Sequence, residues 1–491
     1  MILPIHSQSP TEDTEAGAEL QRTDFGFTES FLIGAATASY QIEGAVNEGG
    51  RGPSIWDTFS HTPGKVLNGD SGDVADDHYH RLEEDLDLIA GLRIDAYRFS
   101  IAWPRIQPTG RGPSNPEGIA FYNRLIDGLL ERGVKPVATL YHWDLPQALE
   151  DEGGWVNRAT SFAFAEYARI AGEAFGDRVA IWSTLNEPWC AAFLGYGEGT
   201  HAPGRTSHRE ALTAAHHLNL AHGLGLVALR ETVSNPLAQY SVTLNTAYYV
   251  GEGEGGDEAV RRLDGVANRI FTGPMLKGAY PEDLLADTAE ITDWSFVLDG
   301  DETLINQPID FLGVNYYFTQ YVTLDPHANR VTTTGGTATP GADDVRIIEK
   351  PGPRTLYGWS ITPEGLEGLL LSLTRQFPGL PLVITENGAS FDDQVVIKGG
   401  ERRVHDPQRI DFLVRHFESA RRAIDQGVDI RGYFVWSLLD NFEWSRGYKE
   451  RFGLIHVDYE TLTRTPKDSA RWLSTVAAGR KPSTSGGTRH E

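Results

Sequence analysis

Short apolar runs alternate along the chain with longer segments in which apolar residues recur every three or four positions. Eight of these runs have the length and the β-branched or aromatic character of buried strands. They span residues 31–39, 96–103, 135–143, 179–187, 240–249, 310–317, 380–388 and 430–438. The intervening segments, among them 80–92, 120–133, 161–176 and 409–427, have the spacing of amphipathic helices. This alternation predicts right-handed βαβ units and a parallel sheet.

Eight such units predict an α/β fold in which the sheet closes into a single (β/α)8 TIM barrel. A doubly wound open sheet is the alternative, but no break in composition divides the 491 residues into the domains that fold would need. We expect the barrel domain to span 25–477, with long loops at the face formed by the carboxyl ends of the strands. The largest expected loop is about 321–355, rich in Thr, Gly and Pro. The polar ends, 1–24 and 478–491, are expected to be disordered.

The charge balance limits the partners of the chain. It has 43 basic and 68 acidic residues, so its net charge is −25 with histidine neutral. Such a field repels polyanions, which argues against nucleic acid, anionic membranes and phosphorylated substrates. A small neutral substrate is therefore expected.

Cysteine content and apolar runs bear on location. Cys190 is the single cysteine, so an intrachain disulfide and a cysteine-based zinc cluster are excluded. The first thirty residues lack a basic start with an apolar core, and no run approaches the roughly 18 residues of a membrane span. We expect a cytoplasmic protein without membrane contact; a homo-oligomer is compatible with the sequence.

Polar and aromatic residues collect at the carboxyl ends of the apolar runs. Along the chain they are Gln41, Glu43, Arg98, His142, Trp143, Asn186, Glu187, Asn245, Asn315, Tyr317, Glu386, Asn387, Trp436, Glu443 and Trp444. In a barrel these ends form one face, where catalytic groups gather. The pattern therefore predicts that all eight strands contribute to one pocket.

Two of these residues have the chemistry of a glycosidase. Glu187 and Glu386 end runs four and seven, so their carboxyl groups should face each other across the barrel mouth, as in enzymes that cleave glycosides. Two carboxylates about 5 Å apart repel by roughly 3 kcal/mol at an effective dielectric near 20, so one of them keeps its proton. Arg98 is the candidate cation to hold Glu386 ionised. The residues alone do not decide which glutamate attacks and which donates the proton.

A set of motifs resembles glycoside hydrolase family 1, the β-glucosidase family. They are FLIGAATASYQIEGA, SIWDTF, YRFSIAWPR, YHWDLPQAL, TLNEP, FLGVNYY, ITENG, VWSLLDNFEW and RFGLIHVDY, in that order between about Phe25 and Trp472. The resemblance implies a retaining exo-β-glucosidase that acts on terminal β-D-glucosyl residues of aryl or alkyl glucosides and cello-oligosaccharides, as in cellulose degradation. It assigns Glu187 as acid/base and Glu386 as nucleophile.

The resemblance also implies which residues surround the reacting sugar. Arg98, Asn315 and Tyr317 would support catalysis, and the substrate-binding residues would be Gln41, His142, Trp143, Asn186, Trp359, Trp436, Glu443, Trp444 and Phe452. Amide, imidazole and carboxylate groups suit vicinal hydroxyls, while indole faces cover the apolar side of a sugar ring. The mechanism implied needs neither a metal nor a cofactor.

Details of these motifs refine the expected specificity. Glu443 stands where relatives that act on 6-phosphorylated sugars have a small residue, so a free sugar is favoured. Glu187 excludes the plant thioglucosidase branch, which has glutamine there. Ile33 departs from an aromatic position of the family pattern, and we interpret it as a change in core packing. A β-galactosidase or β-fucosidase with the same fold, or a catalytically silent sugar-binding protein, are the alternative functions.

Four other features are interpreted as structural. GEGEGG (251–256) matches GxGxxG formally, but its two glutamates would oppose a pyrophosphate, so we expect a flexible loop. In DVADDHYH (73–80), Asp77 is expected to cap the following helix rather than to bind a metal. The histidines at 216, 217 and 222 are expected to be buried and hydrogen-bonded. Cys190 is expected to be a small packing residue near the pocket.

Overall fold

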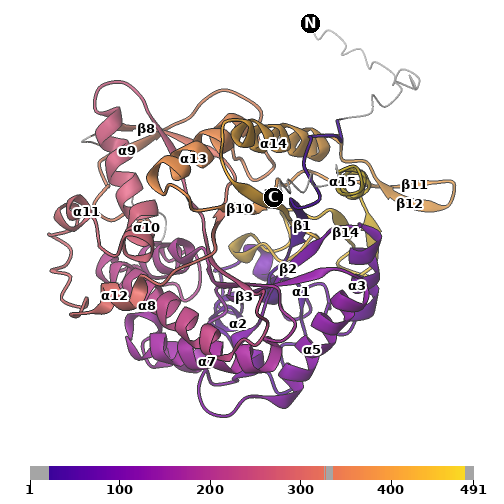
Figure 1. Cartoon of the computed structure of the whole chain (residues 1–491), viewed down its shortest axis with the longest axis horizontal. Coiled ribbons are helices and arrows are strands. Elements are labelled where there is room, and N and C mark those ends of the chain that lie inside the picture. Colours follow the sequence, from indigo (N-terminus) through magenta and orange to yellow (C-terminus); the bar gives the residue numbers. More distant parts are fainter. Residues whose placement is uncertain (1–21, 326, 328–335, 481–491) are drawn as a thin grey trace, which may run out of the picture.

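The computed structural model describes residues 22–325, 327 and 336–480, and a closed barrel of eight parallel strands lies at its centre (Figure 1). The strands are β1 (Leu32–Ala36), β2 (Ala96–Ser100), β3 (Lys135–Tyr141), β4 (Ile181–Asn186), β5 (Gln239–Leu244), β7 (Phe311–Asn315), β10 (Leu382–Asn387) and β13 (Ile430–Trp436). β1 pairs in parallel with both β2 and β13 and so closes the ring. Each strand overlaps one of the eight predicted runs, and the (β/α)8 barrel is confirmed.

Helices form a ring around the strands (Figure 1). The principal ones are α3 (Leu82–Gly91), α5 (Pro116–Glu131), α7 (Ala159–Phe175), α8 (His208–Thr232), α9 (Gly256–Asp264), α13 (Pro363–Gln376), α14 (Pro407–Asp425) and α15 (Asp468–Ala478). The residues at the beginning of several of these helices explain where each helix starts. Asn115 and Ser207 accept hydrogen bonds from backbone N–H groups in the first turns of α5 and α8, and proline opens α5, α13 and α14.

Short elements occupy the connections. The helical ones are α1 (Ser39–Ile42), α2 (Ile55–Ser60), η1 (Leu67–Gly69), α4 (Trp103–Ile106), α6 (Gln147–Asp151), η2 (Gly154–Val156), η3 (Cys190–Glu198), η4 (Gly265–Arg269), α10 (Ile270–Thr272), η5 (Gly273–Lys277), α11 (Glu282–Asp287), α12 (Asp301–Ile305) and η6 (Trp444–Arg446). The extended ones are β6 (Tyr248–Gly251), β8 (Thr319–Leu324), β9 (Val345–Ile348), β11 (Val395–Lys398), β12 (Glu401–Val404), β14 (Ile455–Val457) and β15 (Arg464–Pro466). β6, β8 and β9 form a small separate sheet.

This small sheet changes two expectations. The fifth predicted run divides into barrel strand β5 and outer strand β6, with Asn245 and Thr246 between them. The expected loop at 321–355 contains most of β8 and all of β9, although 326 and 328–335 lie outside the described residues. GEGEGG begins at the last residue of β6 and ends at the first residue of α9, so it makes the turn between them.

The interior of the barrel is filled beneath its carboxyl-end face. Six side chains from six different strands form one apolar cluster: Ala96, Val137, Ile181, Phe311, Val383 and Phe434. Gly34 on β1 leaves room for the ring of Phe434, since a Cβ at this position would lie 2.4 Å from a ring carbon. The barrel is therefore a packed core with its open end at the loops that follow the strands.

The two ends of the described chain contact the barrel. Arg22 forms an ion pair with Glu418, and Arg480 forms one with Asp95. Most of the predicted disordered ends lies outside the described residues, so the domain limits at 25 and 477 stay predictions. Among the described helices, none combines the length and apolar character that a bilayer crossing requires.

One expectation about the region before α3 is wrong. Asp77 does not cap this helix, because α3 begins after Arg81, which makes no side-chain cap. Asp77 instead has a left-handed φ of 55° and contacts the Nδ1 atom of His80 at 2.6 Å. Glu83, Glu84 and Asp85 place negative charge in the first turn of α3, where it is favourable.

The three histidines of α8 are buried and hydrogen-bonded, as expected. His216 contacts Tyr280 and Asp301, His217 contacts a backbone carbonyl, and His222 contacts Thr184. Within the described ranges, no three His, Cys, Asp or Glu side chains gather as a metal-binding group.

Candidate active site

A cavity of about 530 Å³ opens where the barrel strands end. Eleven of the predicted site residues line it: His142, Trp143, Glu187, Asn315, Tyr317, Trp359, Glu386, Trp436, Glu443, Trp444 and Phe452. The other three, Gln41, Arg98 and Asn186, are not among the lining residues and are fully or almost fully buried. Arg98 and Asn186 lie behind the wall and hold residues that line it.

Glu386, on β10, is held at both carboxyl oxygens. Arg98 on β2 donates to its Oε1 at 2.6 Å, and the hydroxyl of Tyr317 donates to its Oε2 at 2.7 Å. Burial and the nearby carboxylate raise the pKa of Tyr317 well above that of a free phenol, so this hydroxyl keeps its proton and remains a donor. A guanidinium and a phenol on one carboxylate favour its ionised form.

Glu187 follows β4 and lies in a different environment. Its Oε1 accepts a hydrogen bond of 2.8 Å from the amide of Asn315, which ends β7. Burial first, and then the negative charge of Glu386, raise the pKa of Glu187 to about 8. Glu187 is therefore mostly protonated at neutral pH, while the contacts of Glu386 favour a carboxylate.

Asn186 connects the two glutamates. Its Oδ1 accepts from Arg98 at 2.7 Å and from Asn315 at 3.1 Å, so one amide oxygen receives donors that also bind Glu386 and Glu187. The two carboxyl groups thus belong to one hydrogen-bonded network built from four strands. A displacement of either glutamate would disturb the other.

Asn186 also determines the state of His142. The amide NH₂ of Asn186 donates to Nε2 of His142 at 3.0 Å, which leaves the ring proton on Nδ1. Burial and the charge of Arg98 lower the pKa of His142 well below its ordinary range, so the imidazole is neutral. His142 therefore presents an N–H group at Nδ1.

Three buried polar atoms have no hydrogen-bond partner among the described residues and lie on predicted sugar-binding side chains. They are Oε1 of Gln41, Nδ1 of His142 and Oε2 of Glu443. Buried polar groups are almost always paired, so unpaired atoms on side chains that line the cavity or lie beside it indicate places for ligand groups. The Gln41 oxygen accepts, the His142 N–H donates and the Glu443 carboxyl can do either, which matches the hydroxyl groups of a sugar.

Three residues that line the cavity have a strained backbone. Trp143, Glu187 and Trp444 have φ values of 74°, 45° and 49°, a left-handed conformation that is rare for large residues. Each of the three follows a barrel strand and lines the cavity, and the rings of Trp143 and Trp444 lie 4.6 Å apart. Strain of this kind concentrates at functional sites, where surrounding packing maintains it.

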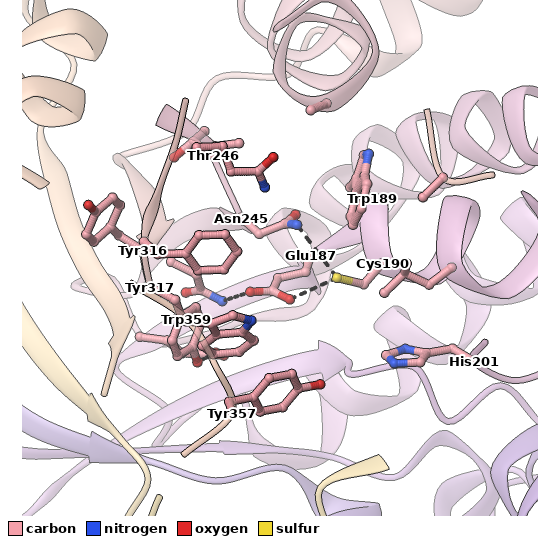
Figure 2. Close-up of a pocket in the computed structure, with 18 of the residues that line it drawn as sticks. Glu187, Trp189, Cys190, His201, Asn245, Thr246, Tyr316, Tyr317, Tyr357 and Trp359 are labelled. Carbon is pink, nitrogen blue, oxygen red and sulfur yellow. Dashed lines mark hydrogen bonds between the residues drawn. The ribbon is translucent and has the colours of Figure 1, made fainter. Parts of the chain in front are cut away.

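The outer part of the cavity includes residues that the sequence patterns did not indicate as ligand-binding. In the view of Figure 2, Tyr357 and Trp359 lie on one side of Glu187 and Trp189 lies on the other. Tyr357 and Trp359 stack at 4.1 Å. Asn245 lines the cavity, as the strand-end pattern predicts, although the family resemblance gave it no role in the site. Tyr357 and Trp189 had no comparable signal, because loop paths depend on tertiary packing.

A further unpredicted contact involves Cys190. Its Sγ lies 3.2 Å from Oε2 of Glu187, on the oxygen that Asn315 does not bind (Figure 2). The expectation of a packing residue near the pocket is therefore incomplete, since the thiol contacts a glutamate of the candidate site itself.

Fold and site together define a class: a barrel with two unlike carboxyl groups in one cavity at the carboxyl ends of its strands has the arrangement of a glycoside hydrolase. The family described as Glycosyl hydrolase family 1 matches residues 23–482. The chain belongs to glycosyl hydrolase family 1, and the resemblance noted in the motifs is confirmed.

Known proteins similar to this chain share nearly its whole length. It is 52% identical to a bifunctional β-D-glucosidase/β-D-fucosidase of Bifidobacterium breve over 91% of this chain and 97% of that protein. It is 47% identical to β-glucosidase A of Thermotoga maritima over 92% and 97%. The crystal structure of a psychrophilic β-glucosidase from Micrococcus antarcticus superposes with a TM-score of 0.88 at 46% identity, covering 93% of this chain and 98% of that one.

Proposed function

We propose that the protein is a retaining exo-β-glucosidase that hydrolyses terminal, non-phosphorylated β-D-glucosyl residues of aryl and alkyl glucosides and cello-oligosaccharides. The observation that supports this most is the contrast between its two carboxyl groups. Arg98 and Tyr317 stabilise Glu386 as an anion, whereas burial and that anion keep Glu187 protonated. Similar proteins named β-glucosidases support the choice of glucose.

In the first half-reaction Glu386 acts as the nucleophile and Glu187 as the acid. A carboxylate oxygen of Glu386 bonds to the anomeric carbon while the bond from that carbon to the leaving oxygen breaks. The leaving oxygen takes the proton of Glu187. Because Asn315 donates to Oε1, the proton of Glu187 is held on Oε2.

In the second half-reaction Glu187 acts as a base. Once Glu386 is an ester its charge is gone, and with it the second cause of the raised pKa of Glu187. Glu187 can then take a proton from a water molecule whose oxygen attacks the anomeric carbon and releases Glu386. Two displacements on opposite faces return the β-anomer.

The electrostatics of the pocket support a neutral sugar as the substrate. Burial and neighbouring carboxylates, first Glu450 and then Glu386 and Glu187, raise the pKa of Glu443 to about 8. The neighbouring carboxylates already disfavour a negative charge on Glu443, so a phosphate at this place would meet a large electrostatic cost in a buried site. Neutral hydroxyls instead supply partners for the unpaired atoms of Gln41, His142 and Glu443.

The decisive experiment is NMR of the first sugar anomer released from a panel of β-glycosides. Release of β-glucose before mutarotation supports retention and glucose specificity together. Initial release of α-glucose would contradict the roles given to Glu187 and Glu386, and an absence of turnover on every glucoside would favour a silent sugar-binding protein.

A second activity, on β-D-fucosides, is favoured by the relative named as a bifunctional glucosidase and fucosidase. We propose that one pocket serves both sugars. Aryl glucoside and aryl fucoside mixed at saturating concentrations should then compete, with a total rate between the two separate rates. A total rate equal to their sum would contradict a shared site, and aryl galactosides test the remaining alternative.

We further propose a cytoplasmic location. The support is compositional: the chain has one cysteine, which is buried, and so makes no use of an oxidising compartment. Cell fractionation with an antibody to the native protein is the test, and recovery outside the cytoplasmic fraction would contradict it.

A further inference from the structure

The single cysteine of the chain lies against the proton-carrying oxygen of the candidate acid. Cys190 begins η3 three residues after Glu187, is 7% exposed, and lines the cavity. Its Sγ lies 3.2 Å from Oε2 of Glu187, while the amide of Asn315 holds Oε1. The carboxyl group is thus contacted at both oxygens by two different elements.

A second contact orients the thiol. The amide of Asn245, just after β5, donates to Sγ of Cys190 at 3.6 Å, within the range for a sulfur acceptor (Figure 2). With the sulfur accepting from Asn245, the S–H group is available to Oε2 of Glu187. Burial and the charge of Glu187 raise the pKa of the Cys190 thiol well above its ordinary range, so the sulfur keeps its proton.

We infer that Cys190 is a positioning residue for the acid/base, whose thiol donates to Oε2 of the ionised Glu187 and so favours the base form needed in the second half-reaction. The inference rests on the proposed role of Glu187. The thiol keeps its proton throughout. In the first half-reaction the proton on Oε2 passes to the leaving oxygen, and the new carboxylate accepts from the S–H group. In the second half-reaction Oε2 regains a proton from water.

Other charged and titratable groups also act on Glu187 or on Cys190, and none of them replaces this contact. They are Glu386 from β10, Arg98 from β2, Tyr317 after β7, Glu443 after β13 and Glu198 from η3. Glu386 and burial favour the protonated acid, and Arg98 favours its ionised form. Only Cys190 and Asn315 bind the Glu187 carboxyl directly among the hydrogen bonds of the described residues.

The test compares Cys190→Ala, Cys190→Val and Cys190→Ser by the pH dependence of kcat/KM. Alanine and valine lack the donor, so the alkaline limb should move to higher pH by a few tenths of a unit to about one unit. Serine restores a stronger donor, so its limb should lie at or below that of the wild type. The acid limb should stay in place in all three variants.

Valine controls for packing. If the thiol only filled space, valine would resemble the wild type, while alanine and serine would deviate together. Shifts of the alkaline limb in the same direction for alanine and serine, or no shift for alanine, would overturn the inference. Circular dichroism and thermal unfolding establish that each variant is folded before its profile is read.

A measurement on the wild-type protein keeps the inference testable if the variants fold poorly. Because the chain has one cysteine, the infrared S–H stretching band reports Cys190 alone. This band should move to lower frequency as Glu187 ionises and should lose that pH dependence in Glu187→Gln. A band that is independent of pH in the wild type would contradict the hydrogen bond.

These results also separate this inference from the proposed function. If Glu187→Gln leaves the alkaline limb of the pH profile unchanged, the acid/base assignment fails. If Glu187→Gln removes that limb while the Cys190 variants keep it in place, the assignment stands and the role of Cys190 fails.

Discussion

The hydroxyl of Tyr317 donates to Oε2 of Glu386 at 2.7 Å, on the carboxylate oxygen that Arg98 does not contact. Each oxygen of the proposed nucleophile therefore has its own donor, one neutral and one charged. The neutral donor can be removed without leaving a charge unpaired. This makes Tyr317 the more informative place to perturb the nucleophile.

Tyr317→Phe removes one of the two side-chain donors that hold the Glu386 carboxylate, and Arg98 alone then orients it. We expect kcat/KM for aryl β-glucosides to fall by about 10-fold or more, the equivalent of one hydrogen bond to a charged group. Tyr321→Phe, on β8, is the control. Unchanged kcat/KM in Tyr317→Phe would contradict the assigned contact.

Glu386→Ala should reduce turnover of aryl β-glucosides by about 10⁴-fold or more, because no nucleophile remains. Added azide should restore activity and give α-glucosyl azide, the product of a single displacement. Mass spectrometry and NMR of the product are the measurement. Glu364→Ala, exposed on α13, is the matched control. A β-azide product would show that Glu386 is not the nucleophile.

Glu187→Ala should separate good leaving groups from poor ones. Only a poor leaving group needs a proton, so phenyl glucoside should lose about 10² to 10⁴-fold in kcat/KM. An activated dinitrophenyl glucoside should lose much less. Rates for a series of aryl glucosides give a slope against leaving-group pKa, and a slope equal to that of the wild type would exclude the acid role.

The wild-type pH profile should have an alkaline limb near pH 8. The proposed acid must be protonated in the free enzyme, and its pKa is raised to about 8 by burial and by Glu386. Activity should therefore be present below this pH and fall as pH rises through it. Measuring kcat/KM from pH 4 to 10 tests this, and a limb that persists in Glu187→Gln would belong to another group.

A buried ion network predicts an effect on stability. Lys467, fully buried, donates to Asp440 at 2.7 Å and also bonds Asp393. Lys467→Met should leave two buried carboxylates without this cation, at a cost of about 3–5 kcal/mol in the free energy of unfolding. Denaturant unfolding measures this cost. Lys398→Met, at an exposed position on β11, should cost less than about 1 kcal/mol.

The pattern of apolar runs predicts the barrel because a barrel strand is buried on both faces. Such a strand is therefore apolar at nearly every consecutive position, which the sequence shows directly. The same rule located Glu187 and Glu386, since strand ends in a barrel converge. The predicted strand boundaries were wrong where strands of the small sheet outside the barrel adjoin the barrel strands. Run 240–249 overlaps both β5 and β6, because a strand outside the barrel is built from the same apolar and β-branched residue types.

The patterns of apolar and polar residues could not predict contacts between loops. The approach of Cys190 to Glu187 depends on the turn into η3, and the position of Tyr357 depends on a loop packed against Trp359. Asp77 had the residue type and place of a helix cap, yet its left-handed backbone directs its side chain to His80. The local sequence allowed this carboxylate either to cap a helix or to contact a neighbouring side chain. The tertiary structure determines that it contacts His80.

The left-handed backbone at Trp143, Glu187 and Trp444 has a consequence for engineering. Glycine would relieve the left-handed torsions, but Trp143 and Trp444 are buried, and losing a buried indole costs about 3–5 kcal/mol, more than the about 1–3 kcal/mol stored in a strained residue. Glycine in place of Glu187 would remove the carboxyl group that contacts Asn315 and Cys190. Substitutions meant to make the protein more heat-resistant should therefore be sought away from these three positions.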